Sequence, residues 1–263
     1  MKVLTDIPFQ IDAESVFATL HLDANSQYAD EVGALIDSAQ RVARPRAAYR
    51  AATVLDREPS AIVITEASQP VEPTPAQSVD GCKSLPHRSH ATPAAGSTTR
   101  QVRLTSRALR VNLDGVAQVF PYVATCGSEL DSVPVAAGDV FGQFCRDTIK
   151  EMALWAALSH LYTHLTETFG LGALASMNPG SGEANVWPIE QQTELFGFLG
   201  DVQAEIGVVL TGSCLMIPNK SVSGILYPSS TNFENCQLCN QQRCSHRRAP
   251  FDAVLWAKTC GEG

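Results

Sequence analysis

The sequence is poor in charge, and the charge that it carries is mainly acidic. Only 17% of the 263 residues are charged, which argues against general disorder and against a long solvated coiled coil. Lys and Arg number 19 against 27 Asp and Glu, for a formal net charge of −8. Because nonspecific nucleic-acid binding needs clustered cations, no nucleic-acid partner is expected. The few short arginine clusters are interpreted as solvated surface.

Long hydrophobic runs are also missing. No apolar run reaches the roughly 18 residues that predict a membrane span, and the first residues lack the apolar core of a signal peptide. The sequence therefore predicts a cytoplasmic protein with no membrane partner. Since disulfides are rare in a reducing compartment, the eight cysteines are not expected to form them. A phosphate loop, a nucleophile elbow and a Ser/His/Asp order are all absent, so whether the chain is an enzyme stays open.

Composition divides the chain into four regions. Residues 1–65 read as helices followed by a strand. Residues 66–100 are rich in proline among small and polar residues, which predicts a low-complexity linker or long surface loop. Residues 101–230 are expected to hold the main core, and residues 231–263 form a cysteine-rich tail.

The core region mixes strands and helices without a regular βαβ period. Strands are predicted at 108–113 and 116–125, joined as a hairpin at Asp114-Gly115. A long buried helix is predicted from Asp139 to Gly170. A second helix, from Pro188 to Gly207, precedes strands at 208–217 and 222–227. This mixture predicts an α+β fold with a largely antiparallel sheet packed with several helices.

The strongest chemical signal is Cys236-x2-Cys239-x4-Cys244 in the tail. Two thiolates on a tight turn can point at one ion, and thiolate-rich sites select zinc or an iron–sulfur cluster. The motif therefore predicts a metal or cluster site. The fourth ligand is Cys126 or Cys260, unless three cysteines hold a cluster with an open iron position.

The histidines near the tail motif and on the long helix are weaker candidates for metal ligands. His246 is too close in sequence to Cys244 for the two to share an ion. His160 and His164 share a helix face, but no third ligand accompanies them, so packing is the favoured interpretation. The tail arginines 243, 247 and 248 are interpreted as surface, or as groups that offset a thiolate cluster or meet an acidic partner.

Two further stretches have the composition of ligand-binding turns. Pro and Gly in Ser176-Met-Asn-Pro-Gly-Ser-Gly182 specify a fixed backbone turn that can present N–H and C=O groups. A second stretch, 210–224, ends an apolar segment in a polar turn with Lys220, Ser221 and Ser223.

In these stretches the chain resembles the reactivation (activation) domain of cobalamin-dependent methionine synthase. The resemblance covers residues 139–228, about a third of the chain. The cysteine tail is similar to that of short stand-alone relatives of this domain. The motifs that carry the resemblance are Pro179-Gly180, Leu195-Phe196, Gly207-Val-Val-Leu210-Thr211, Met216, Pro218 and Ser221-Val222-Ser223-Gly224.

The resemblance implies a curved α+β body that binds S-adenosylmethionine in a shallow groove and docks over a corrinoid. It implies that such a domain supports reductive remethylation of cobalt oxidised to Co(II). The family loop begins with Arg, which engages the carboxylate of S-adenosylmethionine, and has Tyr after the Gly. Here Ser176 and Ser181 stand at these positions. The residues that the resemblance assigns to the groove, together with the polar turn, are Asn178, Pro179, Gly180, Ser181, Lys220, Ser221 and Ser223.

The leading hypothesis is a stand-alone relative of the activation domain that serves a corrinoid protein or methyltransferase. An iron–sulfur cluster on Cys236, Cys239 and Cys244 would pass one electron to cobalt, with a separate protein as electron donor. Two alternatives remain open. One is a non-catalytic module that binds a corrinoid protein and carries structural zinc. The other is an S-adenosylmethionine-binding accessory protein.

Overall fold

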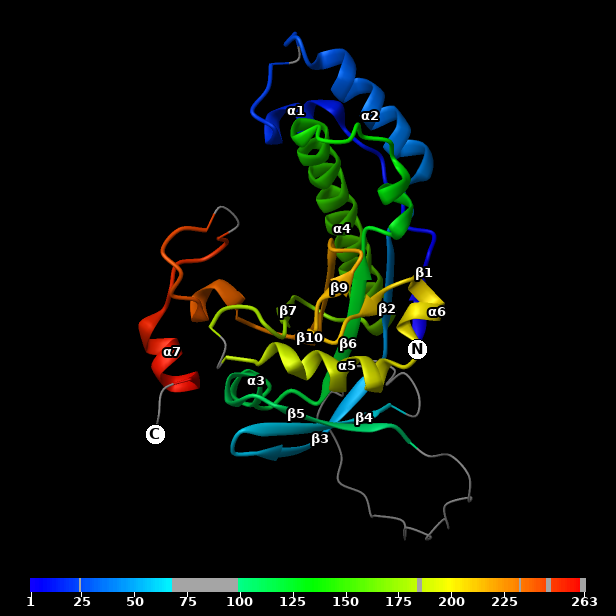
Figure 1. Ribbon diagram of the computed structural model, residues 1–263. Helices are drawn as coiled ribbons and strands as arrows, with labels where there is room; N and C mark the ends of the chain where they lie inside the picture. Colours follow the sequence, from blue (N-terminus) through cyan, green and yellow to red (C-terminus); the bar gives the residue numbers. More distant parts are fainter. Residues whose placement is uncertain (24, 68–98, 184–185, 232, 245–246, 261–263) are drawn as a thin grey trace, which may run out of the picture.

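The computed structural model describes residues 1–23, 25–67, 99–183, 186–231, 233–244 and 247–260. These residues form an α+β fold, in which one eight-stranded sheet is packed with helices (Figure 1). Most of the predicted low-complexity segment 66–100 lies outside the described residues. No helix among the described residues is long and apolar enough to cross a membrane.

Strand β6 (Gln118–Thr125) is the centre of the sheet because it pairs along both edges. One edge is antiparallel to β2 (Arg46–Tyr49) and then to β3 (Ala52–Glu58), and the other edge is antiparallel to β10 (Ser221–Pro228). All of the remaining pairs are antiparallel as well. They add β1 (Lys2–Leu4) to β2, β4 (Ala61–Glu66) to β3, β5 (Gln101–Thr105) to β4, and β7 (Leu174–Met177) to β10.

The sheet confirms the predicted antiparallel pairing. Strands β3, β4 and β5 run across the view of Figure 1, whereas β2 and β6 run up it. Such a change of direction follows from the twist between neighbouring strands. A register shift between Val54 and Asp56 of β3 marks a bulge, which increases twist locally.

The long helix α4 (Val140–Phe169) begins and ends where the sequence predicted. The Asp139 side chain accepts a hydrogen bond from the Gly142 N–H, and Gly170 ends the helix with a φ of 61°. The first half of α4 packs against α1 (Ala13–Thr19), α2 (Ala29–Val42) and η1 (Ser128–Ser132). The second half covers one face of the sheet at Tyr49 and Phe120. The helix therefore joins a helical end of the molecule to the sheet.

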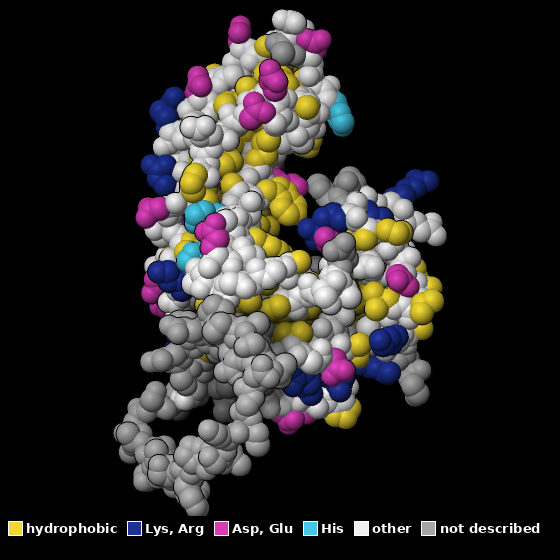
Figure 2. All heavy atoms as spheres, turned by 180° about the vertical axis from the view of Figure 1, so that it is seen from behind, with side chains coloured by type: hydrophobic (Ala, Val, Ile, Leu, Met, Phe, Trp, Pro, Cys, Tyr) yellow, Lys and Arg dark blue, Asp and Glu magenta, His cyan; other side chains and the backbone are white. Residues whose placement is uncertain are grey.

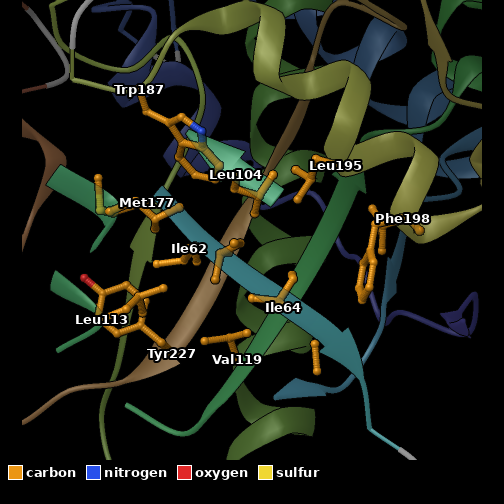
Figure 3. Packing of buried hydrophobic residues seen from close by; sticks show 14 of the residues in the cluster. Ile62, Ile64, Leu104, Leu113, Val119, Met177, Trp187, Leu195, Phe198 and Tyr227 are labelled. Carbon is orange, nitrogen blue, oxygen red and sulfur yellow. The ribbon is translucent and has the colours of Figure 1, made fainter. Parts of the chain in front are cut away.

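The opposite face of the sheet carries the largest core cluster. In Figure 3 the side chains of Ile62, Ile64 and Val119 lie on the sheet near Leu195 and Phe198 of α5. The helices around this cluster, some of them in the tail, are α3 (Arg107–Asn112), η2 (Ile189–Gln191), α5 (Gln192–Leu199), α6 (Val202–Ile206), η3 (Asn235–Leu238) and α7 (Ala253–Thr259).

Three local predictions were wrong, each for a local reason. The predicted strand 108–113 is helix α3, because the Ser106 hydroxyl accepts a hydrogen bond from the Leu109 N–H and caps a helix there. Asp114-Gly115 is consequently the turn into β6, not a hairpin. The predicted helix 188–207 is broken at Gly200, whose φ of 106° is incompatible with a helix.

The predicted strand 208–217 is instead a small hairpin of β8 (Val209–Leu210) and β9 (Met216–Ile217). Between the two strands the chain turns back, and the Thr211 N–H donates to the Leu215 carbonyl at 2.8 Å. Cys214, with a φ of 60°, lies inside this turn. A left-handed residue at that point is incompatible with a continuous strand.

Candidate functional site

A groove of about 590 Å³ lies between the second half of α4, the loop after β7 and the tail. Figure 2 shows, from behind, a hollow between the helical end and the side of the molecule that carries the tail. Hydrophobic and basic side chains lie beside this hollow. The residues that line the groove come from all three segments and from the sheet. They include Tyr122, Glu151, Trp155, Tyr162, Ser176, Asn178, Ser181, Val222, Phe233, Glu234, Cys236, Cys239, Cys244 and Arg248.

Asn178 fixes the loop side of the groove. Its amide nitrogen donates to the Tyr122 hydroxyl and to the Ser223 carbonyl, both at 2.8 Å. Its amide oxygen accepts from Ser176 Oγ at 3.2 Å and from Asn235 Nδ2 at 2.8 Å. One side chain thus joins β6, β7, β10 and the tail.

The other predicted loop residues line a second hollow of about 530 Å³, which Asn178 also lines. Pro179 is buried, and Gly180 adopts a φ of 77° while its N–H donates to the Trp187 carbonyl at 2.8 Å. Ser181 lines both hollows. The loop therefore has the fixed backbone that its Pro and Gly predicted, with a face toward each hollow.

The polar turn contributes to the two hollows unequally. Ser221 and Ser223 line the second hollow, and their hydroxyls bond to Thr125 Oγ1 at 2.8 Å and to Gln192 Oε1 at 3.0 Å. Lys220 lines neither hollow but holds Glu151, a residue of the groove, through an ion pair of 2.9 Å. The structure thus assigns Lys220 to the support of the groove wall and not to its lining.

Gly224, the last residue of the Ser-Val-Ser-Gly motif, permits a close approach of the loop to β10. A Cβ added there would lie 2.4 Å from the Met177 carbonyl oxygen and 2.5 Å from Asn178 Nδ2. Since real Cβ atoms do not come so close, only glycine fits without a shift of the loop. This glycine is required for packing and not for an unusual backbone angle.

The helix side of the groove is aromatic. Trp155, Ser159 and Tyr162 lie on one face of α4, and 47% of the Trp155 surface is exposed. Burial raises the pKa of Tyr162 and also the pKa of Tyr122 on the neighbouring strand. Both phenols are therefore neutral at physiological pH and can donate or accept hydrogen bonds, but do not act as anions.

The tail side of the groove carries charge. The Arg248 guanidinium lies over the Trp155 ring, 5.8 Å from its centroid, and Nη2 is 2.9 Å from Glu234 Oε2. The side chains of Arg248 and Glu234 keep 47% and 36% of their surface exposed. The predicted interpretation of this arginine as solvated surface was therefore incomplete, since it also faces the groove.

Cys236, Cys239 and Cys244 all line the groove, as members of one wall. The two candidates for a fourth ligand do not line it: Cys126 is buried in the cluster at the helical end, and Cys260 packs against the main core. Burial raises the pKa of Cys126 to about 12. Among the described residues, which do not include His246, no group of three or more metal-ligating side chains is placed to hold an ion.

Arg247 organises the loop that carries these cysteines. Its guanidinium donates to the carbonyls of Cys236, Cys239 and Ala249, each at 3.1 Å, and to that of Gln241. These bonds gather residues 236–241 and Ala249 around one cation. The Arg247 side chain therefore holds this loop, and Cys236, Cys239 and Cys244 line the groove.

His164 has the packing role that was favoured for the helical histidines. His164 Nε2 lies 3.0 Å from the Tyr49 hydroxyl, against the sheet. Burial lowers the pKa of His164.

Sequence reasoning missed the aromatic and charged walls of the groove. Trp155 lies inside the predicted buried helix but was not singled out, and Glu234 was not considered. The spacing of Trp155, Ser159 and Tyr162 along one helix face is a signal that could have indicated a functional face. Nothing in the sequence indicates that the tail lies opposite this face.

Comparison with known proteins gives one informative result. No protein-family model and no curated protein sequence matches the chain. Among solved structures, the chain is similar to the crystal structure of the MetH reactivation domain bound to AdoHcy, with a TM-score of 0.50 and 15% sequence identity. The match covers 89% of this chain and 81% of that chain. The chain therefore has an activation-domain-like fold, and the predicted fold class is confirmed.

Proposed function

We propose that this chain is an activation-domain-like protein that assists the reductive reactivation of a corrinoid-dependent methyltransferase. The observation that carries the proposal is the groove itself. It is built where α4, the Asn178 loop and β10 meet, on a fold like that of the MetH reactivation domain. Two of the motifs that resemble methionine synthase, Pro179-Gly180 and Ser221-Val222-Ser223-Gly224, lie in this loop and in β10.

In this proposal the groove receives an S-adenosylmethionine-type ligand and faces the corrinoid of the partner. The corrinoid, held by the partner, supplies the redox and methyl-transfer chemistry. The chain contributes binding and orientation. The neutral phenols of Tyr122 and Tyr162 and the amide of Asn178 offer fixed hydrogen-bonding groups, and Trp155 offers a flat apolar wall. The AdoHcy bound to the similar domain supports this choice of ligand.

The tail thiols extend the proposal to a metal or cluster. Cys236, Cys239 and Cys244 share one wall of the groove, and their loop would have to close further before three thiolates met at one ion. Soft thiolates favour an iron–sulfur cluster or zinc over harder metals. A cluster would fit a role in electron delivery, whereas zinc would fit a binding module whose tail is shaped by metal.

Reactivation is tested with a corrinoid protein from the same organism, held in the Co(II) state. A low-potential chemical reductant and S-adenosylmethionine are added, and methylation of the corrinoid is followed by its absorption spectrum. We expect the chain to raise the rate of methylation severalfold, and only when both reagents are present. No rate increase, together with no detectable binding of the corrinoid protein, would contradict the proposal.

The thiol site is tested separately by purification without oxygen, followed by iron, sulfide and zinc analysis. Iron with sulfide would support the electron-transfer version, and stoichiometric zinc in a colourless protein would support the binding-module alternative. Cys239→Ser should remove the metal in either case, and Cys260→Ser tests one of the candidate fourth ligands. A chain that takes up neither metal would overturn both versions.

A further inference from the structure

Two side chains of opposite charge lie side by side in the groove. Arg248 and Glu234, both on the tail side, form an ion pair and remain partly exposed. Among the described residues, Glu234 and the Trp155 ring are the partners found for the Arg248 guanidinium. A guanidinium has five N–H donors, so most of its donors stay available to a ligand in the groove.

The pair is held in a fixed position. The Glu234 carboxylate caps η3 by accepting from the Gln237 backbone N–H, while the Gln237 side chain bonds back to the Glu234 N–H at 2.9 Å. The guanidinium rests on Trp155, which α4 holds from the opposite side of the groove. Both charges are therefore positioned before any ligand arrives, which lowers the cost of ordering on binding.

We propose that the Arg248–Glu234 pair is the binding point for a zwitterionic α-amino acid group. The ligand carboxylate is received by Arg248, and its ammonium group is received by Glu234. The exposed Trp155 ring and the neutral phenol of Tyr162 lie along the same groove, and they suit a flat ring attached to that amino acid group. The inference rests on the proposed function, since it gives the ligand groove of that proposal a specific recognition point.

The charge of the groove supports a zwitterion over a simple anion. Among the described residues that line the groove, the charged side chains besides Arg248 are the carboxylates of Glu151 and Glu234. Glu151 is held by Lys220 at 2.9 Å, which leaves Glu234 as the carboxylate beside the guanidinium. A phosphate or a lone carboxylate at Arg248 would be repelled by Glu234, whereas an ammonium group on the same ligand turns that repulsion into attraction.

The arrangement also explains how the groove can do without a cation on the loop. Ser176 and Arg248 line the same groove, Ser176 from β7 and Arg248 from the tail. The cation for a ligand carboxylate is therefore present in the groove, but it comes from a segment more than 70 residues away in sequence. Recognition of the amino acid group would depend on a correctly folded tail.

The test is titration calorimetry of the full chain with three probes. The probes are S-adenosylmethionine, its decarboxylated form, and methylthioadenosine, which lacks the amino acid group. We expect S-adenosylmethionine to bind at least about tenfold more tightly than the other two, as expected for one charge-assisted hydrogen bond. Arg248→Gln should remove this preference and leave the affinity for methylthioadenosine within about twofold of the wild-type value.

Arg243→Gln is the matched control, because Arg243 lies exposed in the same loop but does not line the groove. Glu234→Gln is a second variant, and it should weaken S-adenosylmethionine more than a des-amino analogue. Equal affinities for all three probes, no binding of any probe, or an Arg248→Gln variant that behaves like Arg243→Gln would each overturn the inference. Reactivation by a chain that fails this test would leave the proposed function standing.

Discussion

The two walls that face each other across the groove are built in different ways. The loop wall consists of β7, β10 and Asn178, and it is tied by short hydrogen bonds to the centre of the sheet. The tail wall is folded around the Arg247 guanidinium and is attached to the core mainly through Leu238 and the residues of α7. The loop wall is thus part of the fold, whereas the tail wall is added to it.

This difference indicates how the groove can be both fixed and adjustable. Substitutions in the loop wall should lower the stability of the whole sheet. The tail wall can be loosened while the sheet stays intact, because few of its contacts are long-range backbone pairs. Substitutions on the two walls should therefore have distinct effects on stability and on binding.

The largest effect is expected on the loop wall at Gly224. Gly224→Ala places a Cβ against the Met177 carbonyl and the Asn178 amide, so the loop must move. We expect a loss of about 2–3 kcal/mol in the free energy of unfolding, as for an overpacked interior. Denaturant unfolding measures this loss. Gly212→Ala, with nothing within 4 Å of the added Cβ, is the control, and equal stability of the two variants would contradict the close approach.

Asn178→Ala should have a somewhat smaller effect, which again spreads to the sheet. It removes the donor to the Ser223 carbonyl and to the Tyr122 hydroxyl, and it removes the acceptor for Asn235. Buried partners without hydrogen bonds cost about 1–3 kcal/mol, so we expect a loss of about 2 kcal/mol in unfolding free energy. Ligand binding should weaken in parallel. Unchanged stability would show that the loop wall is less tightly coupled to the sheet than described.

Arg247→Ala should affect the tail wall alone. The loss of the guanidinium leaves four carbonyls of residues 236–249 without their shared donor. We expect faster hydrogen exchange in this segment and little change in β10, with a loss of global stability of about 1 kcal/mol or less. Arg243→Ala is the control. Equal exchange in the two variants would contradict the role of Arg247 in folding the loop.

The smallest effect on stability, namely none, is expected from alkylation of the tail thiols under native conditions. Burial raises the pKa of Cys126 to about 12 and that of Cys145 to about 11, so at pH 8 only about 1 in 10,000 and 1 in 1,000 of these thiols are ionised. The partly exposed Cys236, Cys239 and Cys244 should react first. Mass spectrometry after iodoacetamide treatment checks this order. Modification of Cys126 before the tail thiols would contradict the burial of Cys126.

The pH dependence of alkylation also distinguishes the buried thiols from the tail thiols. Because the thiolate is the reactive form, the rates at Cys126 and Cys145 should rise about tenfold per pH unit from pH 8 toward their raised pKa values. Cys126 should lag behind Cys145 throughout. A plateau for Cys126 near pH 9 would indicate a thiol that is not buried, and would restore it as a candidate ligand near the tail.

The parts that the sequence predicted well depend on local chemistry. The bounds of α4 follow from the capping residue Asp139 and from Gly170, and the fixed turn after Asn178 follows from Pro179 and Gly180. Helix α3 was missed because its alternating apolar residues are typical of a strand, while the deciding cap lies outside them at Ser106.

The tail wall could not be predicted because its contacts join distant segments. Trp155 and Arg248 meet across the groove although they lie more than 90 residues apart, and no periodicity or motif relates them. The thiol motif was visible in the sequence, but its place opposite an aromatic helix face was not. The predicted domain boundaries and the metal remain predictions.

The most direct test of the central claim, that the groove between α4, the Asn178 loop and the tail faces the partner, is hydrogen–deuterium exchange of the chain with and without a Co(II) corrinoid protein. We expect protection on binding to concentrate in residues 151–162 of α4 and in residues 233–248 of the tail. Protection confined to α1 and α2, at the helical end, would contradict this claim.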